Sequence, residues 1–243
     1  MSDDCWPTHY GPQREQVPVK NRYFSILFNG TTSEIDCGDD ASVQGLPNSD
    51  FTVDAWIQAD GYGENNEGRI IDKWSNFFAG WYFTVHSGVG LRAEIEDVFN
   101  VADTRIGLDD FTADGAWHHV VMAWDTGTQS IFMAVDGTWA PDYDTQTFGG
   151  GAYPGDVGTD LVIGNNAAGD YTFDGSIQWL RISDTLRWAV GVDFTPPGMC
   201  APPVVDADTV ELWVLDEGEG TDAEAAVDAG NDGTIADGTW QTC

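Results

Sequence analysis

AWHHVVMAWDTGTQSIFMAVDG, residues 116–137, carries the clearest strand pattern of this chain. Within it, residues 117–124 alternate as a strand, and both faces of that strand are largely apolar. Residues 125–129, DTGTQ, are typical of a turn. Ser130–Val135 is a second β-rich run, which a tight turn at Asp136-Gly137 ends. The stretch therefore predicts a buried antiparallel hairpin, covered on both sides, in a large β-sandwich.

Other blocks along the chain resemble segments of one known family. They are SILFNG (25–30), FTVDAWI (51–57), IIDK (70–73), GWYF (80–83), LVIG (161–164) and FDGSIQWLRI (173–182). Together with the order WHHV, hairpin and VDG, they resemble the laminin G-like, concanavalin A-like lectin and glucanase domains over roughly residues 23–190. The resemblance implies an all-β, antiparallel jelly-roll β-sandwich. It implies no single function, because sites are grafted onto folds.

Composition and length suit one sandwich domain. The 243 residues include 11 Trp, 12 Phe, 7 Tyr and 29 Gly, which fit many short strands joined by tight turns. We expect residues 1–22 to form an extended arm and residues 23–243 to form a single domain. Residues 204–243 carry LWVLDEGEGT and GNDGT, which resemble a segment that often precedes the family's first strand. We expect them to close the same sandwich in permuted order, because the termini of a sandwich lie close together.

The charge balance excludes several classes of partner. There are 41 acidic and 9 basic residues, and the net charge is −32. Such a chain repels phosphate backbones and anionic lipid surfaces, so we expect no nucleic-acid binding. No apolar run is long enough to span a bilayer, so we expect no membrane insertion. The acidity favours solubility, cation binding or a salty or calcium-rich medium.

Four cysteines indicate the compartment. They are Cys5, Cys37, Cys200 and Cys243, and they lack the close CxxC spacing of zinc sites. Outside the cytoplasm they would form two disulfides, with three possible pairings. No secretory segment follows Met1, so either a signal was removed or the protein reaches its place as a virion component would. We therefore expect an extracellular or virion-surface location.

The resemblance also implies a structural calcium ion, held by backbone carbonyls near the first strand and by a later Asp. The corresponding positions here are Asn29, Gly30 and Gln178, and two of them are neutral amides where the family has Asp. The lost charge should weaken the site. Turns rich in Asp, such as Asp228 and Asp232, could supply ligands instead, and calcium is the expected cofactor.

A ligand face follows from strand alternation. If Val53 and Leu180 face the core, then a second set of residues shares the opposite, usually concave, face: Asp54, Trp56, Trp179 and Arg181. Aromatic platforms with a few polar groups suit sugar rings. Rim candidates are Tyr62, Trp74, Trp81, Trp139, Tyr143 and Tyr153. The alternative is that these large aromatic residues are simply packed under loops.

Catalytic patterns are weak. His118 and His119 are neighbours on a strand, point to opposite faces and cannot share a metal ion. Glu34 and Glu94 begin the strings nearest to a glucanase motif, but solvated charge is the better interpretation in so acidic a chain. The sequence contains no G-x-S-x-G elbow, phosphate loop or H-E-x-x-H. We therefore expect no enzyme.

Three functions remain open, in order of preference. The first is a non-catalytic, extracellular carbohydrate-binding or adhesion module, stabilised by calcium, whose partner is a glycan or a cell-surface protein. The second is a structural surface protein, such as a phage capsid decoration or fibre protein or a filament subunit, that contacts virion proteins or forms a homo-oligomer. The third is a glycoside hydrolase.

Overall fold

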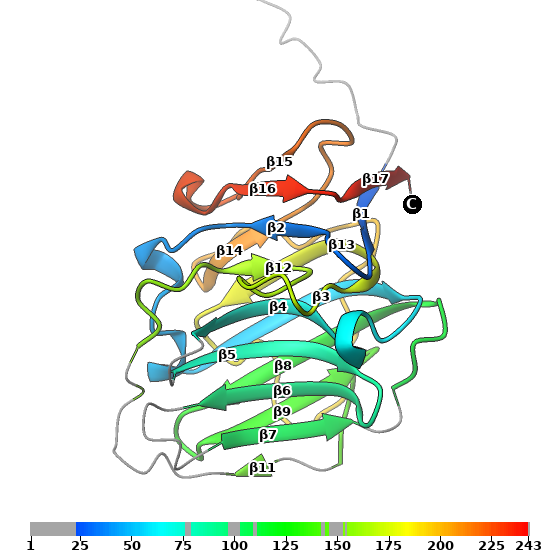
Figure 1. Ribbon diagram of the computed structural model, residues 1–243. Helices are drawn as coiled ribbons and strands as arrows, with labels where there is room; N and C mark the ends of the chain where they lie inside the picture. The colour runs from blue at the N-terminus through cyan, green and yellow to red at the C-terminus, as the bar shows by residue number, and fades with distance from the viewer. Residues whose placement is uncertain are drawn as a thin grey trace, which may run out of the picture.

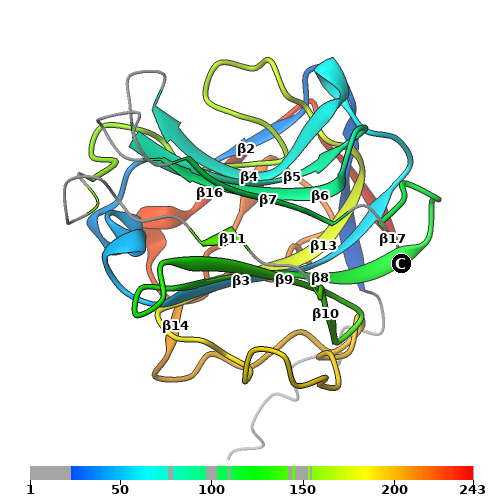
Figure 2. The ribbon, with the colours of Figure 1, turned by 90° about the horizontal axis from the view of Figure 1, so that it is seen from below.

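The computed structural model describes residues 23–75, 79–96, 103–108, 111–141, 144–145, 153 and 155–242. These residues form two antiparallel β-sheets that pack face to face (Figure 1, Figure 2). The predicted all-β, antiparallel jelly-roll sandwich is thereby confirmed. None of the helices in this part of the chain is long or apolar enough to cross a membrane.

The first sheet, called sheet A here, has the strand order β10-β9-β8-β3-β13-β1-β17, with β14 against β13 and β11 against β9. Its strands are β1 (Phe24–Asn29), β3 (Phe51–Ala59), β8 (Trp117–Asp125), β9 (Ser130–Val135), β10 (Thr138–Trp139), β11 (Asp144–Thr145), β13 (Asp174–Ser183), β14 (Thr209–Trp213) and β17 (Thr239–Thr242).

The second sheet, sheet B, has the order β15-β16-β2-β12-β4-β5-β6-β7. Its strands are β2 (Glu34–Asp36), β4 (Glu67–Ser75), β5 (Ala79–His86), β6 (Gly90–Glu96), β7 (Asp103–Leu108), β12 (Val162–Ile163), β15 (Asp222–Ala223) and β16 (Gly233–Ala236). Short 3-10 helices in the connections are η1 (Ala41–Val43), η2 (Leu46–Asn48), η3 (Glu64–Asn66) and η4 (Ala229–Asn231).

The predicted hairpin is formed by β8 and β9, which pair antiparallel from Val120 opposite Val135 to Asp125 opposite Ser130. Side chains of β8 alternate between two apolar layers. Val120, Met122 and Trp124 enter the core between the sheets. Those of Val121 and Ala123 enter a second cluster on the outer face of sheet A. The hairpin is therefore covered on both sides, as its apolar faces require.

The C-terminal residues complete both sheets. Strand β14 pairs with β13 and β17 pairs with β1 in sheet A. In sheet B, β16 pairs with β2. Residues 209–242 therefore close the same sandwich that residues 23–183 build, and Figure 1 shows β16 and β17 beside β2 and β1.

A long connection, residues 184–208, crosses the outer face of sheet A between β13 and β14, and we call it the strap. Figure 2 shows it in yellow and orange along the side of β3, β8 and β9 that faces away from sheet B. Its residues Leu186, Trp188, Val190 and Phe194 pack against the outer cluster of β8 and β9. The sequence of this Pro-rich segment does not show which surface it covers.

Candidate functional site

The predicted ligand face exists, but it is closed. Asp54, Trp56, Trp179 and Arg181 do lie together on the outer face of sheet A, through the pairing of β3 with β13. The strap covers them, and Trp179 is 0% exposed. The indole N–H of Trp56 donates to the carbonyl of Pro197 in the strap at 2.8 Å. The expectation of an open sugar platform here was wrong, because the strap buries these aromatic rings.

The polar residues beneath the strap form a paired cluster. Arg181 donates from Nε and Nη2 to the two carboxylate oxygens of Asp54, at 2.9 and 3.0 Å. Nε2 of His119 lies 3.2 Å from the same carboxylate. Aromatic rings enclose His119, at centroid distances of 5.7–6.1 Å: Trp56, Trp179, Trp188 and Phe194. Buried charges persist only when paired, and Arg181 and Asp54 pair with each other here. The rings of Trp188 and Phe194 in the strap pack on His119 of this cluster.

The other predicted aromatic residues are scattered. Trp81 belongs to the core between the sheets, and Tyr153 is buried there as well. Tyr62 packs partly against the same core. Trp74 lies half-buried on sheet B, edge to face with Tyr82. Tyr143 lies outside the described residues.

Trp139 borders an open pocket of about 270 Å³ at the edge of sheet A. Two segments form its walls: the turn and edge around β9 and β10, and residues 190–193 of the strap. The lining residues are Phe132, Trp139, Ala140, Pro141, Val190, Gly191 and Asp193. The volume is just below the range of about 300–1,000 Å³ for small-ligand sites, so the pocket suits a single small group such as one sugar ring.

Local contacts hold this pocket in shape. The indole N–H of Trp139 donates to the carbonyl of Val192 at 3.1 Å and ties the strap to β10. Phe132 meets the Trp139 ring edge to face, with centroids 6.5 Å apart. The walls are therefore apolar and aromatic. Among the described lining residues, the exposed carboxylate of Asp193 is the charged group. Such a surface suits the CH faces of a sugar ring, and the carboxylate suits its hydroxyl groups.

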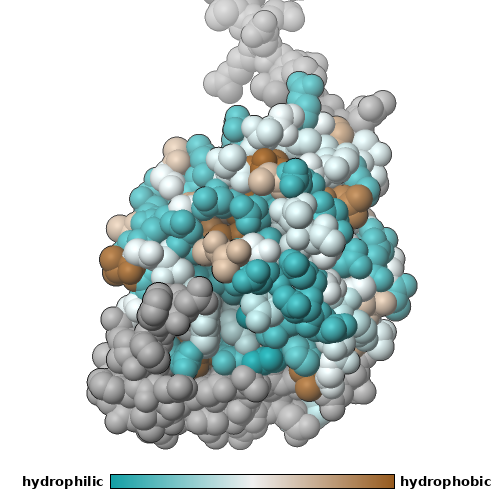
Figure 3. Space-filling model, in the orientation of Figure 1, coloured by the Kyte–Doolittle hydropathy of each residue, from teal (hydrophilic) through white to brown (hydrophobic). Residues whose placement is uncertain are grey.

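The outer face of sheet B carries a second polar cluster, which the sequence did not reveal. The guanidinium of Arg69 lies between Tyr82 and Tyr171, at 3.5 and 4.5 Å from the ring centroids. It also pairs with Asp72 at 2.8 Å and Glu67 at 2.7 Å. Figure 3 shows that the visible part of this face is mostly hydrophilic. These groups satisfy one another, so the cluster stabilises the face.

The two strings considered for catalysis lie on different strands of sheet B. Glu34 and Asp36 are both on β2, and Glu94 and Glu96 are both on β6, two residues apart in each case. Tyr82 and Arg92 donate hydrogen bonds to Glu94. The carboxylate of Glu94 is therefore engaged in structural contacts on the outer face of sheet B.

The two adjacent histidines have different partners. Nδ1 of His118 lies 2.7 Å from the carboxylate of Asp136, whereas His119 contacts Asp54 under the strap. The two rings therefore point to opposite faces of β8, as alternation predicts.

The predicted calcium ligands lie in three separate places: the turn after β1, strand β13 and helix η4. Oδ1 of Asn29 already accepts backbone N–H bonds from residues 31–33. Carboxylate oxygens of Asp228 and Asp232 accept hydrogen bonds from backbone N–H groups as well. Gly30 lies directly after β1, and Gln178 lies in β13. No group of three or more His, Cys, Asp or Glu side chains in the described ranges could hold a metal ion. Calcium binding stays a prediction, with Asn29, Gly30 and Gln178 as one predicted set of ligands and Asp228 and Asp232 as the alternative set.

The predicted disulfides find no support at the two described cysteines. Cys37 and Cys200 are free thiols, and Cys5 and Cys243 lie outside the described residues. Cys37 is in the core, where burial raises the pKa of its thiol. That burial makes it inert toward exchange with exposed thiols.

The pKa of Asp72 predicts how stability depends on pH. Burial raises it from 3.8 to about 6, although Arg69 and the backbone N–H of Trp74 partly oppose this shift. The folded protein therefore holds this proton more tightly than the unfolded chain, so stability falls as pH rises from about 4 to about 6. We expect this group to make the free energy of unfolding about 1 kcal/mol higher at pH 5 than at pH 7.

Urea unfolding at the two pH values checks this expectation. Asp72→Asn should remove this part of the pH dependence, because its side chain does not titrate. Equal pH dependence in the wild type and Asp72→Asn would contradict the assignment.

The two-sheet architecture defines a jelly-roll sandwich of the lectin type. Residues 29–189, more than half of the chain, match the family model described as the concanavalin A-like lectin/glucanases superfamily. The chain belongs to that family. No match was found among curated proteins.

Several solved structures are similar to this chain. A Bacteroides ovatus protein, for which carbohydrate binding has been suggested, is 16% identical, with a TM-score of 0.64; the match covers 91% of this chain and 60% of that one. Domains LG4-5 of the mouse laminin α1 chain are 16% identical, with a TM-score of 0.48 and coverage of 66% and 42%. A sialidase CBM40 of Ruminococcus gnavus, bound to α2,3 sialyllactose, is 13% identical, with a TM-score of 0.46 and coverage of 61% and 85%.

Proposed function

We propose that this chain is a non-catalytic, extracellular carbohydrate-binding module, and that a neutral sugar binds in the pocket beside Trp139. The observation that carries this proposal is the open pocket of about 270 Å³ with aromatic walls and one carboxylate at its rim. The family includes lectins, and the Bacteroides ovatus protein has been suggested to bind carbohydrate. This chain spans 60% of that protein's length.

The charge of the chain determines which glycans fit. The net charge is −32, and Asp193 adds a carboxylate at the pocket itself. Anionic sugars are therefore repelled, and no basic side chain is among the described lining residues to pair with them. A neutral ring can place its apolar CH groups against Phe132 and Trp139 and donate hydroxyl hydrogens to Asp193. We therefore expect neutral glycans to bind better than sialylated or uronic-acid glycans.

A panel of immobilised neutral and acidic glycans tests the proposal. Val190→Asp places a charge in the apolar wall at a partly exposed position, so the fold should survive. We expect it to weaken binding of the preferred neutral glycan about tenfold or more, equivalent to about 1.4 kcal/mol. Trp139→Ala should weaken binding at least as much, because it removes an aromatic wall.

Trp240→Ala is the matched control, since Trp240 is a partly exposed indole on β17, at the opposite edge of sheet A. It should leave binding unchanged. The proposal fails if the wild type retains no neutral glycan, or if Val190→Asp binds as well as the wild type.

A further inference from the structure

The second half of the strap is an exposed apolar surface on a very acidic protein. Residues 196–205, PPGMCAPPVV, contain no charged side chain, and none of them is buried. Val204 is 85% exposed, and Val205 is 40% exposed. Exposed apolar patches that are bordered by polar residues commonly mark interaction sites. This segment, which we call the strap end, is therefore a candidate contact surface.

The strap end is held on the domain at both of its ends. The indole N–H of Trp56 donates to the carbonyl of Pro197, and the guanidinium of Arg187 donates to both carboxylate oxygens of Asp206. Four of the ten residues are proline, which has a fixed φ and no backbone N–H. The surface is therefore preformed, and a segment that binds it must use side-chain contacts more than strand pairing.

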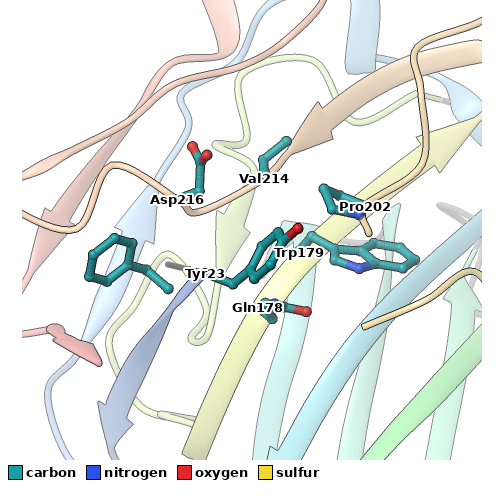
Figure 4. Close-up of a pocket in the computed structure, with 7 residues that line it drawn as sticks. Tyr23, Gln178, Trp179, Pro202, Val214 and Asp216 are labelled. Carbon is teal, nitrogen blue, oxygen red and sulfur yellow. The ribbon is translucent and has the colours of Figure 1, made fainter. Parts of the chain in front are cut away.

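The N-terminal arm joins the domain beside the strap end. Tyr23, where the described residues begin, lines the same narrow crevice as Pro202 (Figure 4). Tyr23 is itself 41% exposed, and it extends the apolar surface toward the arm. Nine extended residues span at most about 30 Å, so residues 14–22 are long enough to reach the strap end from Tyr23.

The charge of residues 14–22 complements the domain. This segment, REQVPVKNR, holds three of the nine basic residues of the chain and one acidic residue. Basic side chains described in the domain are already paired with carboxylates: Arg69, Lys73, Arg92, Arg181 and Arg187. Directly after the strap end, Asp206 and Asp208 are exposed. The arm therefore combines an apolar run, Val17-Pro18-Val19, with the charge that suits this acidic border.

We propose that the strap end is the docking surface for this chain's own N-terminal arm, and that residues 14–22 bind it. In this arrangement Val17 and Val19 pack against the exposed valines of the strap end, and Lys20 and Arg22 lie near the carboxylates at its border. A second copy of the chain is a less suitable occupant, because two molecules of net charge −32 repel each other. The contact does not depend on sugar binding.

Paramagnetic broadening in the full protein tests this contact. Cys200 is an exposed thiol in the strap end and can carry a nitroxide label, whereas Cys37 is buried. With the two cysteines outside the described residues replaced by serine, this label should strongly broaden the ¹⁵N–¹H resonances of residues 14–22. The control label is on Val157→Cys in a Cys200→Ser background. Val157 is 75% exposed and precedes β12 of sheet B, so its label should broaden these resonances little.

A charge placed in the strap end separates docking from mere tethering at Tyr23. Val204→Asp adds a carboxylate to the apolar surface at a highly exposed position, so the fold should survive. We expect it to remove most of the broadening of residues 14–19. Val227→Asp is the matched control, because Val227 is also exposed but lies between β15 and η4. It should leave the broadening unchanged.

Three results would overturn the proposal. The first is broadening of residues 14–22 that is no stronger from the Cys200 label than from the Val157→Cys label. The second is a Val204→Asp variant with the broadening of the wild type. The third is equally strong broadening in a mixture in which the nitroxide and the ¹⁵N label are on different molecules, since this would assign the arm to a second copy.

Discussion

Replacing Asp54 with alanine is expected to lower the free energy of unfolding by about 3–5 kcal/mol, the usual cost of removing one partner from a buried ion pair. Asp54 is fully buried and accepts two hydrogen bonds from Arg181. Its loss leaves the guanidinium of Arg181 buried without a counter-charge, and leaves Nε2 of His119 without a partner. Urea unfolding of the wild type and the variant measures the difference.

Asp170→Ala is the control for removing a carboxylate from so acidic a chain. Asp170 is exposed in the loop before β13, and we expect its replacement to change stability by less than about 0.5 kcal/mol. If Asp54→Ala lowered the free energy of unfolding as little as Asp170→Ala, the buried ion pair beneath the strap would not stabilise the fold. That result would contradict our interpretation of this face.

Gly137→Ala is expected to lower the free energy of unfolding by about 2–4 kcal/mol, from backbone strain together with overpacking. Gly137 has φ +82°, and a Cβ atom there would lie 1.9 Å from the carbonyl oxygen of Phe194 in the strap. The strap is joined to this turn by a 2.9 Å hydrogen bond from the Phe194 N–H to the Gly137 carbonyl. Displacement of the strap by the added methyl group should also distort the Trp139 pocket and weaken sugar binding.

Gly169→Ala isolates the cost of backbone conformation. Gly169 has φ +75°, but a Cβ atom there would meet nothing within 4 Å. We expect this variant to lose about 1 kcal/mol and to bind sugar normally. A stability loss of the same size in both variants, measured by thermal and urea unfolding, would show that the strap yields to the added methyl group.

Local patterns in the sequence predicted the strands and their faces. The alternation of Phe51, Val53, Ala55 and Ile57 in β3 gave the core face correctly, since all four residues are buried between the sheets. The same alternation placed Asp54 on the opposite face. Alternation does not show what covers that face, because the strap reaches it from more than a hundred residues away in the chain. The sugar platform was therefore placed on a surface that is closed.

Two site residues were misread or missed for identifiable reasons. Trp81 begins the alternation Trp81, Phe83 and Val85 in β5, and this pattern was enough to assign it to the core rather than to a rim. The bulge at Gln178 inserts one residue into β13 without a glycine or proline at that position, so no residue type there indicates it. Its two neighbouring outward side chains are visible only in the register of β13 against β3.

A crystal structure of the protein with the neutral oligosaccharide that it prefers shows directly where the sugar binds. We expect one sugar ring in the pocket at the edge of sheet A, against Phe132 and Trp139, with a hydroxyl group within hydrogen-bond distance of Asp193. A sugar bound on the outer face of sheet B, with this pocket empty, would contradict it.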